Sequence, residues 1–311
     1  MQENDSVSGP DIVGSSTPRN DFVMERIVMV QYTPLSAQLS RNPDSIKTMA
    51  REVIGSIHDL RYEAHVLHRD IKDNTIMHTV RDGADHFVLI DFDRSVEVNS
   101  DGQPKEESFP PYRTPALPFM AWDMVLPARD ATFTPNQSSH RPWPVDCVRH
   151  DFESLFWLCL WYGIKTRNML RLNRMFSVFK LMASVSLNPL ADWLSGGEYA
   201  PFHDRKSPLF HDWEWLDAMP LSASYEHLRQ WFVAFSSCFA AGYAARRAYR
   251  KSLKSKSEAQ AVLDVPVEAY ETWFGHVTRD ALIRSLDNFD LGNFDYEKTS
   301  PWGAWFFTSE E

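Results

Sequence analysis

A predicted β-hairpin with an acid at each outer end is the feature that most restricts the fold of this chain. Residues 75–80 and 86–90 read as two short strands, and Arg81-Asp82-Gly83 between them has the composition of a tight turn. Asp70 lies in the stretch before the first strand, and Asp91 follows directly after the second. We therefore expect the hairpin to bring two carboxylates to one edge.

Two acids in this arrangement suit phosphoryl transfer, because that reaction needs carboxylates in two different roles. Asp70 can orient or deprotonate an attacking hydroxyl. Asp91 can hold the magnesium ion that neutralises charge on the phosphates. Each acid taken alone also fits an ordinary loop or strand end, so the prediction depends on the pair.

Four motifs in a fixed order resemble the C-terminal lobe of eukaryotic protein kinases, and most closely the fungal-type protein kinase family. They are His68-Arg69-Asp70-Ile71-Lys72, then Asp91-Phe92-Asp93, then Thr114-Pro115 with Phe119 to Asp123, and finally His150 to Leu155 followed by Trp157 and Trp161. The resemblance covers roughly residues 25–290. It implies ATP and Mg²⁺ as cofactors and Ser or Thr of a protein as the acceptor.

The resemblance also implies the role of each catalytic residue. Asp70 falls on the catalytic acid, while Arg69 and Lys72 fall on the neighbouring positions that contact the activation segment and the transferred phosphate. Asp91 falls on the metal ligand, and Phe92 follows it as the aromatic member of the Asp-Phe pair.

Structural support is expected from His68, Phe92, Asp123 and Asp151. The resemblance implies that Asp151 accepts hydrogen bonds from the backbone near His68 and Arg69. It also suggests a buried ion pair between Asp123 and an arginine, for which Arg279 and Arg284 are the candidates.

One position departs from the kinase pattern. Kinases have an Asn five residues after the catalytic Asp, where this chain has Thr75, and Asn74 lies one place earlier. A Thr hydroxyl is a shorter and weaker oxygen donor for magnesium than an amide, and Asn74 points to the other face if the backbone is extended. We expect Thr75 to contact the metal, with Thr75 and Asn74 at the cofactor.

The expected fold class is α+β, a mostly α-helical kinase-like C-lobe with a small catalytic-loop hairpin and an N-lobe that is largely missing. Residues 1–25 contain only two glycines, and no Lys precedes Lys47, so no glycine-rich phosphate loop with its strand Lys is expected. The predicted organisation is a disordered polar tail at 1–24, a kinase-like domain at 25–290 and an aromatic tail at 291–311.

Further elements follow from periodicity and composition. Residues 26–32 predict a strand that leads into a hinge at 33–35, and the apolar stripe of residues 45–67 predicts an amphipathic helix capped by Ser45. Residues 151–164 are apolar nearly all round and predict a buried helix. Helices are also predicted at 169–185, 225–249 and 270–286, and a loop at 191–220.

Composition narrows the classes of partner. The chain has 311 residues, 43% of them hydrophobic, and a net charge of -10 from 32 basic and 42 acidic residues. This charge argues against nucleic acid or a membrane as a partner, so a protein substrate or protein partner is expected. No signal peptide or membrane span is predicted, which favours an intracellular location, cytoplasmic or nuclear.

Three functions stay open at this point. The first is ATP-dependent phosphorylation of protein Ser or Thr, weak or absent in this chain alone because the glycine loop and N-lobe Lys are not found. The second is a non-catalytic, pseudokinase-like interaction module. The third is a small-molecule phosphotransferase, against which Arg69, Lys72 and the later Thr-Pro segment favour a peptide acceptor.

Overall fold

The computed structural model describes residues 32–102, 105, 117–124, 146–164, 221–252 and 267–287. Within them the chain combines helices with two small antiparallel sheets, as the α+β class predicts. Of the strand predicted at 26–32 only Tyr32 is described, and it is not part of a strand. The helix predicted at 169–185, the loop at 191–220 and both predicted tails lie outside the described residues.

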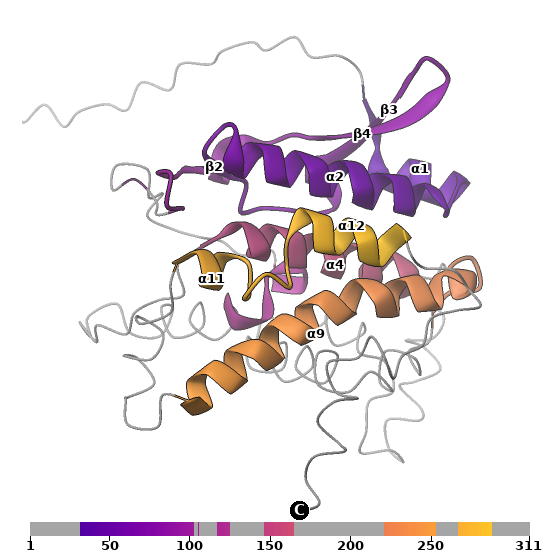
Figure 1. Ribbon diagram of the computed structural model, residues 1–311. Coiled ribbons are helices and arrows are strands. Elements are labelled where there is room, and N and C mark those ends of the chain that lie inside the picture. Colours follow the sequence, from indigo (N-terminus) through magenta and orange to yellow (C-terminus); the bar gives the residue numbers. More distant parts are fainter. Residues whose placement is uncertain are drawn as a thin grey trace, which may run out of the picture. The chain divides into compact units, whose positions relative to one another are not determined.

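Figure 1 shows how these elements are arranged. One sheet has the order β1-β3-β4 and the other pairs β2 with β5. The strands are β1 (Thr33–Pro34), β2 (Val66–Leu67), β3 (Ile76–Arg81), β4 (Ala84–Leu89) and β5 (Val96–Glu97). The helices are α1 (Leu35–Arg41), α2 (Ser45–Tyr62), α4 (Val148–Ile164), α9 (Arg229–Ser252), α11 (Val267–Glu271) and α12 (Arg279–Asp287).

Four short 3₁₀ turns complete the described elements. They are η1 (Asp73–Thr75), η2 (Phe92–Arg94), η4 (Leu117–Phe119) and η5 (Glu226–Leu228). Among the helices of the described ranges, none is long and apolar enough to cross a membrane.

The predicted hairpin is confirmed. β3 and β4 pair antiparallel from Ile76 opposite Leu89 to Arg81 opposite Ala84. The two loop residues, Asp82 and Gly83, have φ angles of 52° and 79°. Positive φ at both loop residues gives the backbone twist that matches two paired strands, which explains the Asp-Gly sequence there.

The first long helix ends earlier than predicted. Its apolar stripe is buried as expected, from Ile46 to Ile57, but α2 stops at Tyr62 and not at residue 67. His65 has a φ of 55°, a left-handed conformation that a helix cannot contain, and the chain then enters β2. The predicted cap is also wrong, because the Ser45 hydroxyl donates to Asp85 Oδ2 at 3.1 Å and so joins α2 to the hairpin.

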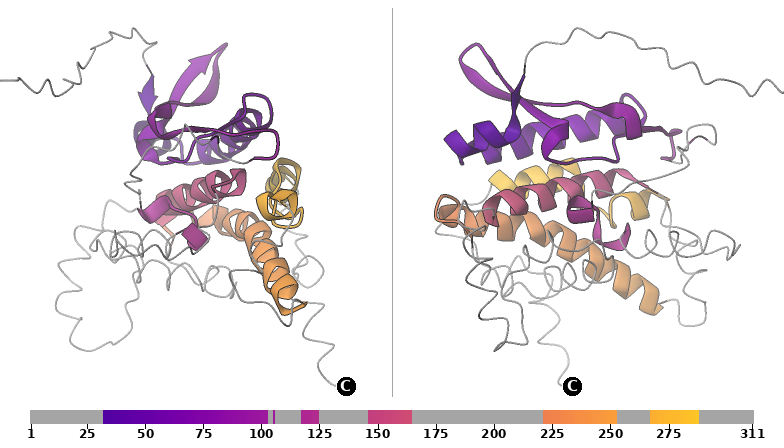
Figure 2. Two further views of the ribbon diagram at one scale, coloured as in Figure 1. Left: turned by 90° about the vertical axis from the view of Figure 1, so that its left-hand side faces the viewer. Right: turned by 180° about the vertical axis from the view of Figure 1, so that it is seen from behind.

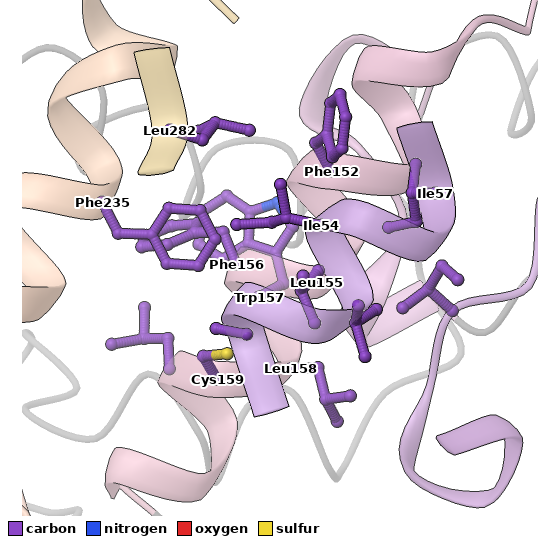
Figure 3. Close-up of a cluster of buried hydrophobic side chains, with 14 of the residues drawn as sticks. Ile54, Ile57, Phe152, Leu155, Phe156, Trp157, Leu158, Cys159, Phe235 and Leu282 are labelled. Carbon is purple, nitrogen blue, oxygen red and sulfur yellow. The ribbon is translucent and has the colours of Figure 1, made fainter. Parts of the chain in front are cut away.

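The helical layers pack around α4. Figures 1 and 2 show α2 between the hairpin on one side and α4 with α12 on the other, and α9 packs against α4 and α12. The helix predicted at 151–164 is therefore confirmed, with a start at Val148. Figure 3 shows the core that fills the centre, with α4 side chains such as Phe156 and Trp157 between Ile54 of α2 and Phe235 of α9.

The later helical predictions have mixed outcomes. The helix predicted at 225–249 is confirmed as α9, which η5 precedes. The single helix predicted at 270–286 is wrong, because Trp273, Phe274 and Gly275 have φ angles of 47°, 59° and 83° and separate α11 from α12. α12 then begins anew, with the Thr278 hydroxyl accepting the backbone N–H of Ala281 at 3.1 Å.

Candidate active site

The two acid-bearing loops meet at one end of the hairpin. The catalytic loop, residues 68–75, runs from β2 to β3, and residues 90–94 follow β4. His68 Nε2 lies 3.1 Å from the carbonyl oxygen of Ile90, and the Ile90 N–H donates to the carbonyl oxygen of Thr75 at 2.9 Å. The His68 and Phe92 rings pack with centroids 5.0 Å apart. We call residues 68–75 and 90–94 the catalytic edge.

Asp70 is buried, and two cations reach one of its carboxylate oxygens. Lys72 Nζ forms an ion pair with Asp70 Oδ2, and Arg94 Nε lies 3.5 Å from the same oxygen. The Asp70 N–H donates to His68 Nδ1 at 3.3 Å. The structure therefore brings the predicted Asp70 and Lys72 together and adds Arg94 of η2, which the sequence did not indicate.

Asp91 differs from Asp70 in its exposure. It is exposed at the end of β4, and its φ of 66° and ψ of 69° place it in the left-handed region that Asp tolerates better than most residues. Phe92 after it is 44% exposed, although its ring contacts His68.

The donor set at this edge fits magnesium. The described residues contain no group of three His, Cys, Asp or Glu side chains that could enclose a metal ion. Mg²⁺ does not need such a cage, since it is commonly held by one or two carboxylates together with substrate phosphates and water. The exposed carboxylate of Asp91 suits that mode of binding.

Thr75 does not lie as a metal ligand would. Its side chain is fully buried. Its hydroxyl oxygen lies 2.9 Å from the Asp70 carbonyl and 3.1 Å from the Lys72 carbonyl, and it accepts the Lys72 N–H at 3.0 Å. The prediction that Thr75 contacts the metal and the cofactor is therefore corrected, because its hydroxyl instead holds the backbone of the catalytic loop. Asn74 is exposed on η1, so it stays a candidate for the cofactor.

The predicted tether from α4 to the catalytic loop is confirmed. Asp151 accepts the His68 N–H at 2.9 Å and the Arg69 N–H at 2.8 Å through its two carboxylate oxygens. Burial raises the pKa of Asp151, and His68 and the two amides oppose that rise. The tether fixes the backbone directly before Asp70.

The Arg69 side chain turns toward Asp146. Its Nε lies 2.8 Å from Asp146 Oδ2, and both side chains are largely buried. Arg69 is predicted to contact the activation segment, residues 94–123, of which residues 103–104 and 106–116 lie outside the described residues.

The predicted partner of Asp123 is wrong. Asp123 pairs with Arg149, whose Nη2 and Nη1 lie 2.7 and 3.2 Å from its two oxygens, and the side chains are 5% and 0% exposed. Arg279 and Arg284 are exposed on α12. Burial alone would raise the pKa of Asp123, but the adjacent Arg149 and His150 outweigh it and hold this pKa well below the usual range.

Two residues of α4 that sequence reasoning missed hold the segment around Asp123. Arg149 pairs with Asp123, and Glu153 accepts the backbone N–H of Trp122 at 2.6 Å. A usable signal was present, because a charged residue next to or inside a helix predicted to be buried needs a buried partner. Arg94 at the other end of the site gave no comparable signal.

Comparison with known families gives a match that contains this site. The family described as fungal protein kinase matches residues 6–163, which is just over half of the chain. The matched range includes the catalytic edge, Asp123 and nearly all of α4. None of the curated proteins matches the chain.

Proposed function

The chain belongs to the fungal protein kinase family, and on that premise we propose that it transfers the terminal phosphoryl group of ATP to a Ser or Thr hydroxyl of a protein. The observation that supports this proposal most is the meeting of the loops of Asp70 and Asp91 at one end of the hairpin. The described residues then correspond to the C-terminal lobe of a kinase.

In this proposal Asp70 serves the acceptor. Its carboxylate orients the hydroxyl and takes its proton, while the hydroxyl oxygen bonds to the γ-phosphorus and the bond from that phosphorus to the β,γ-bridging oxygen breaks, releasing ADP. The backbone before Asp70 is fixed by Asp151 and the backbone after it by Thr75. This double support keeps the carboxylate in one place during the transfer.

Lys72 and Asp91 serve the phosphates. Lys72 already lies at the Asp70 carboxylate, so a γ-phosphate placed there meets its ammonium group. Asp91 would hold magnesium, and the exposed Asn74 of η1 is the candidate for a contact with the nucleotide. When bound, magnesium neutralises charge on the phosphate oxygens.

A binding experiment tests the metal role first. Mg·ATP at 100 times its Kd stabilises a folded protein by about 2.7 kcal/mol, which thermal melting detects as a rise in Tm. We expect this rise in the wild-type chain and in Asp93→Asn, a matched exposed neighbour, and we expect Asp91→Asn to lose its magnesium-dependent part. Equal shifts in both variants would remove Asp91 from the metal site.

A transfer experiment tests the reaction itself. We expect ³²P from γ-labelled ATP to appear on a degenerate library of Ser and Thr peptides with the wild-type chain. Asp70→Asn should keep the Mg·ATP shift in Tm and lose the transfer. Label on small alcohols or amines with none on peptides would instead favour a small-molecule phosphotransferase.

Two observations favour the non-catalytic alternative. Thr75, in place of the Asn of kinases, directs its hydroxyl into the loop, and Lys72 and Arg94 both lie on Asp70. An interaction module of this kind needs no nucleotide. If Mg·ATP produces no shift in Tm in the wild-type chain, this alternative replaces the proposed transfer.

A further inference from the structure

The first two turns of α4 hold two separate segments of the chain at once. Asp151 holds the catalytic loop through the amides of His68 and Arg69. Arg149 and Glu153 hold the segment 117–124. Residues four apart on a helix share a face, and residues two apart do not, so α4 grips the two segments from different sides of the same turns. We call Asp123, Arg149, Asp151 and Glu153 the α4 clasp.

Arg149 is fixed on every side of its guanidinium. Besides the two bonds to Asp123, its Nε donates to the Tyr270 carbonyl at 3.1 Å. Its Cζ lies 3.7 Å from the centroid of the Trp273 ring. A bidentate carboxylate on its edge and an indole on its face therefore fix the planar guanidinium both within its plane and across it.

Glu153 holds the same segment by a second route. It accepts the Trp122 N–H, and its other oxygen accepts the Tyr243 hydroxyl at 2.7 Å. The Tyr243 hydroxyl also lies 3.3 Å from Asp123 Oδ1, so this residue of α9 contacts both acids through which the clasp holds the segment 117–124. The segment 117–124 cannot shift against α4 without breaking charge-assisted hydrogen bonds in a buried site.

From these contacts we infer that Arg149 is a positioning residue that sets the segment 117–124 relative to the catalytic loop. The inference rests on the proposed function, because the segment 117–124 lies at the end of the activation segment that is expected to bind the peptide substrate. The inference requires that loss of the Arg149 contacts makes the turn of α4 that contains Asp151 more mobile. The coupling passes through one contiguous group of buried contacts.

Arg61 offers a matched control. It forms a second buried ion pair, with Glu271 of α11, and the two side chains are 2% and 6% exposed. Its Nη2 donates to the carbonyl oxygen of Ser100 at 3.2 Å. Ser100 belongs to neither of the two segments that the α4 clasp holds. Arg61→Met therefore removes a pair of the same chemistry and burial, whose hydrogen bonds go to Glu271 and Ser100 and to no member of the α4 clasp.

Hydrogen exchange of single backbone amides tests the inference without requiring activity. The amides of His68 and Arg69 report on the catalytic loop, and the Phe87 amide, which Glu52 of α2 accepts at 2.6 Å, is the reference in the hairpin. We expect Arg149→Met to accelerate exchange at His68 and Arg69 relative to Phe87 by about 2-fold to 30-fold. Arg61→Met should leave this ratio unchanged.

A conservative variant separates positioning from simple loss of stability. Arg149→Lys keeps the charge and loses the bidentate geometry, so its exchange ratio should lie between wild type and Arg149→Met. If Arg149→Met does not fold, Asp123→Asn replaces it, because it leaves Arg149 its Tyr270 and Trp273 contacts. An unchanged ratio in every foldable variant at these two positions overturns the inference.

A kinetic measurement connects the inference to the reaction. If the chain phosphorylates peptides, Arg149→Lys should raise KM for the peptide and leave KM for ATP unchanged, and an equal change in both would contradict the positioning role. If no transfer is found, the proposed function fails, while the exchange ratio still decides whether Arg149 couples the two segments.

Discussion

The two acids that follow β4 at the catalytic edge and the charged residues of the α4 clasp are the same kinds of side chain in opposite environments. At the edge, Asp91 and Asp93 are exposed at the end of a strand. In the clasp, Asp123 and Arg149 are withdrawn from water and matched bond for bond. An exposed acid stays available to a ligand, whereas a buried acid is tolerated only because its partner is part of the protein. Exposure therefore distinguishes Asp91, which can meet a metal, from Asp123, which holds the site. The side chain of Asp70 is buried like that of Asp123, but the side chain of its partner Lys72 is 21% exposed.

The residue that joins the two regions should show the largest effect. Asp151→Ala removes the acceptor of two amides, those of His68 and Arg69, and an unsatisfied buried donor costs about 1–3 kcal/mol. We expect the free energy of unfolding, measured by urea denaturation, to fall by about 2–5 kcal/mol. Asp151→Asn keeps one acceptor oxygen and should lose roughly half as much. A fall as small as that of a surface substitution would show that the two regions are independent.

A substitution of Thr75 tests whether its hydroxyl holds the catalytic loop or contacts the metal. Thr75→Val keeps the shape and removes the oxygen that bonds to the loop backbone at Asp70 and Lys72. We expect a loss of about 1–3 kcal/mol of unfolding free energy, with the Mg·ATP shift in Tm unchanged. Thr79→Val on the half-buried side of β3 is the matched control and should be nearly neutral. Loss of the magnesium dependence without destabilisation would return Thr75 to the metal site.

The catalytic edge was largely predictable from sequence because its determinants are local. Asp82-Gly83 specifies a two-residue turn with positive φ, and the strands on either side then place the loops of Asp70 and Asp91 at one end. Thr75 was placed correctly in the chain but not in its role. Whether its hydroxyl points outward or into the loop depends on hydrogen bonds that spacing does not reveal.

The clasp was only partly predictable because its pairs form between distant segments. Asp151 could be assigned through the kinase resemblance, but the partner of Asp123 could not. The sequence indicated Arg279 and Arg284, whereas burial in the folded chain selects Arg149 inside α4. The break at Trp273 to Gly275 was missed for the same reason, since the Trp273 ring packs on Arg149 in the fold.

Glu153 should make the free energy of unfolding depend on pH in the direction opposite to that of Asp123 and His150. Burial raises the pKa of Glu153, and the neighbouring Asp123 adds to that rise. The folded chain therefore binds this proton more readily than the unfolded chain. Its contribution to stability is present below the unfolded pKa of about 4.3 and is lost as the pH rises through the folded value.

Glu153→Gln isolates that contribution. The amide oxygen can still accept from Trp122, and the variant has no proton to release. Asp123 and His150 have lowered pKa values and act in the opposite direction, so the difference between wild type and variant is the quantity to measure. As the pH rises, wild type should lose about 1.4 kcal/mol relative to the variant for each unit by which folding raises this pKa. Parallel stability curves for the two proteins would exclude Glu153 as the source.

The smallest effect is expected from an Arg–carboxylate pair that has the chemistry of the clasp and the exposure of the edge. Arg51 of α2 and Asp287 of α12 form an ion pair with side chains 54% and 39% exposed. Water and salt screen such a pair, so Arg51→Ala should change the unfolding free energy by about 0.5 kcal/mol or less, and added salt should reduce even that. Urea denaturation at low and high salt measures it. A loss equal to that of Asp151→Ala would mean that charge pairing between α2 and α12, and not burial, decides which charged residues hold this fold.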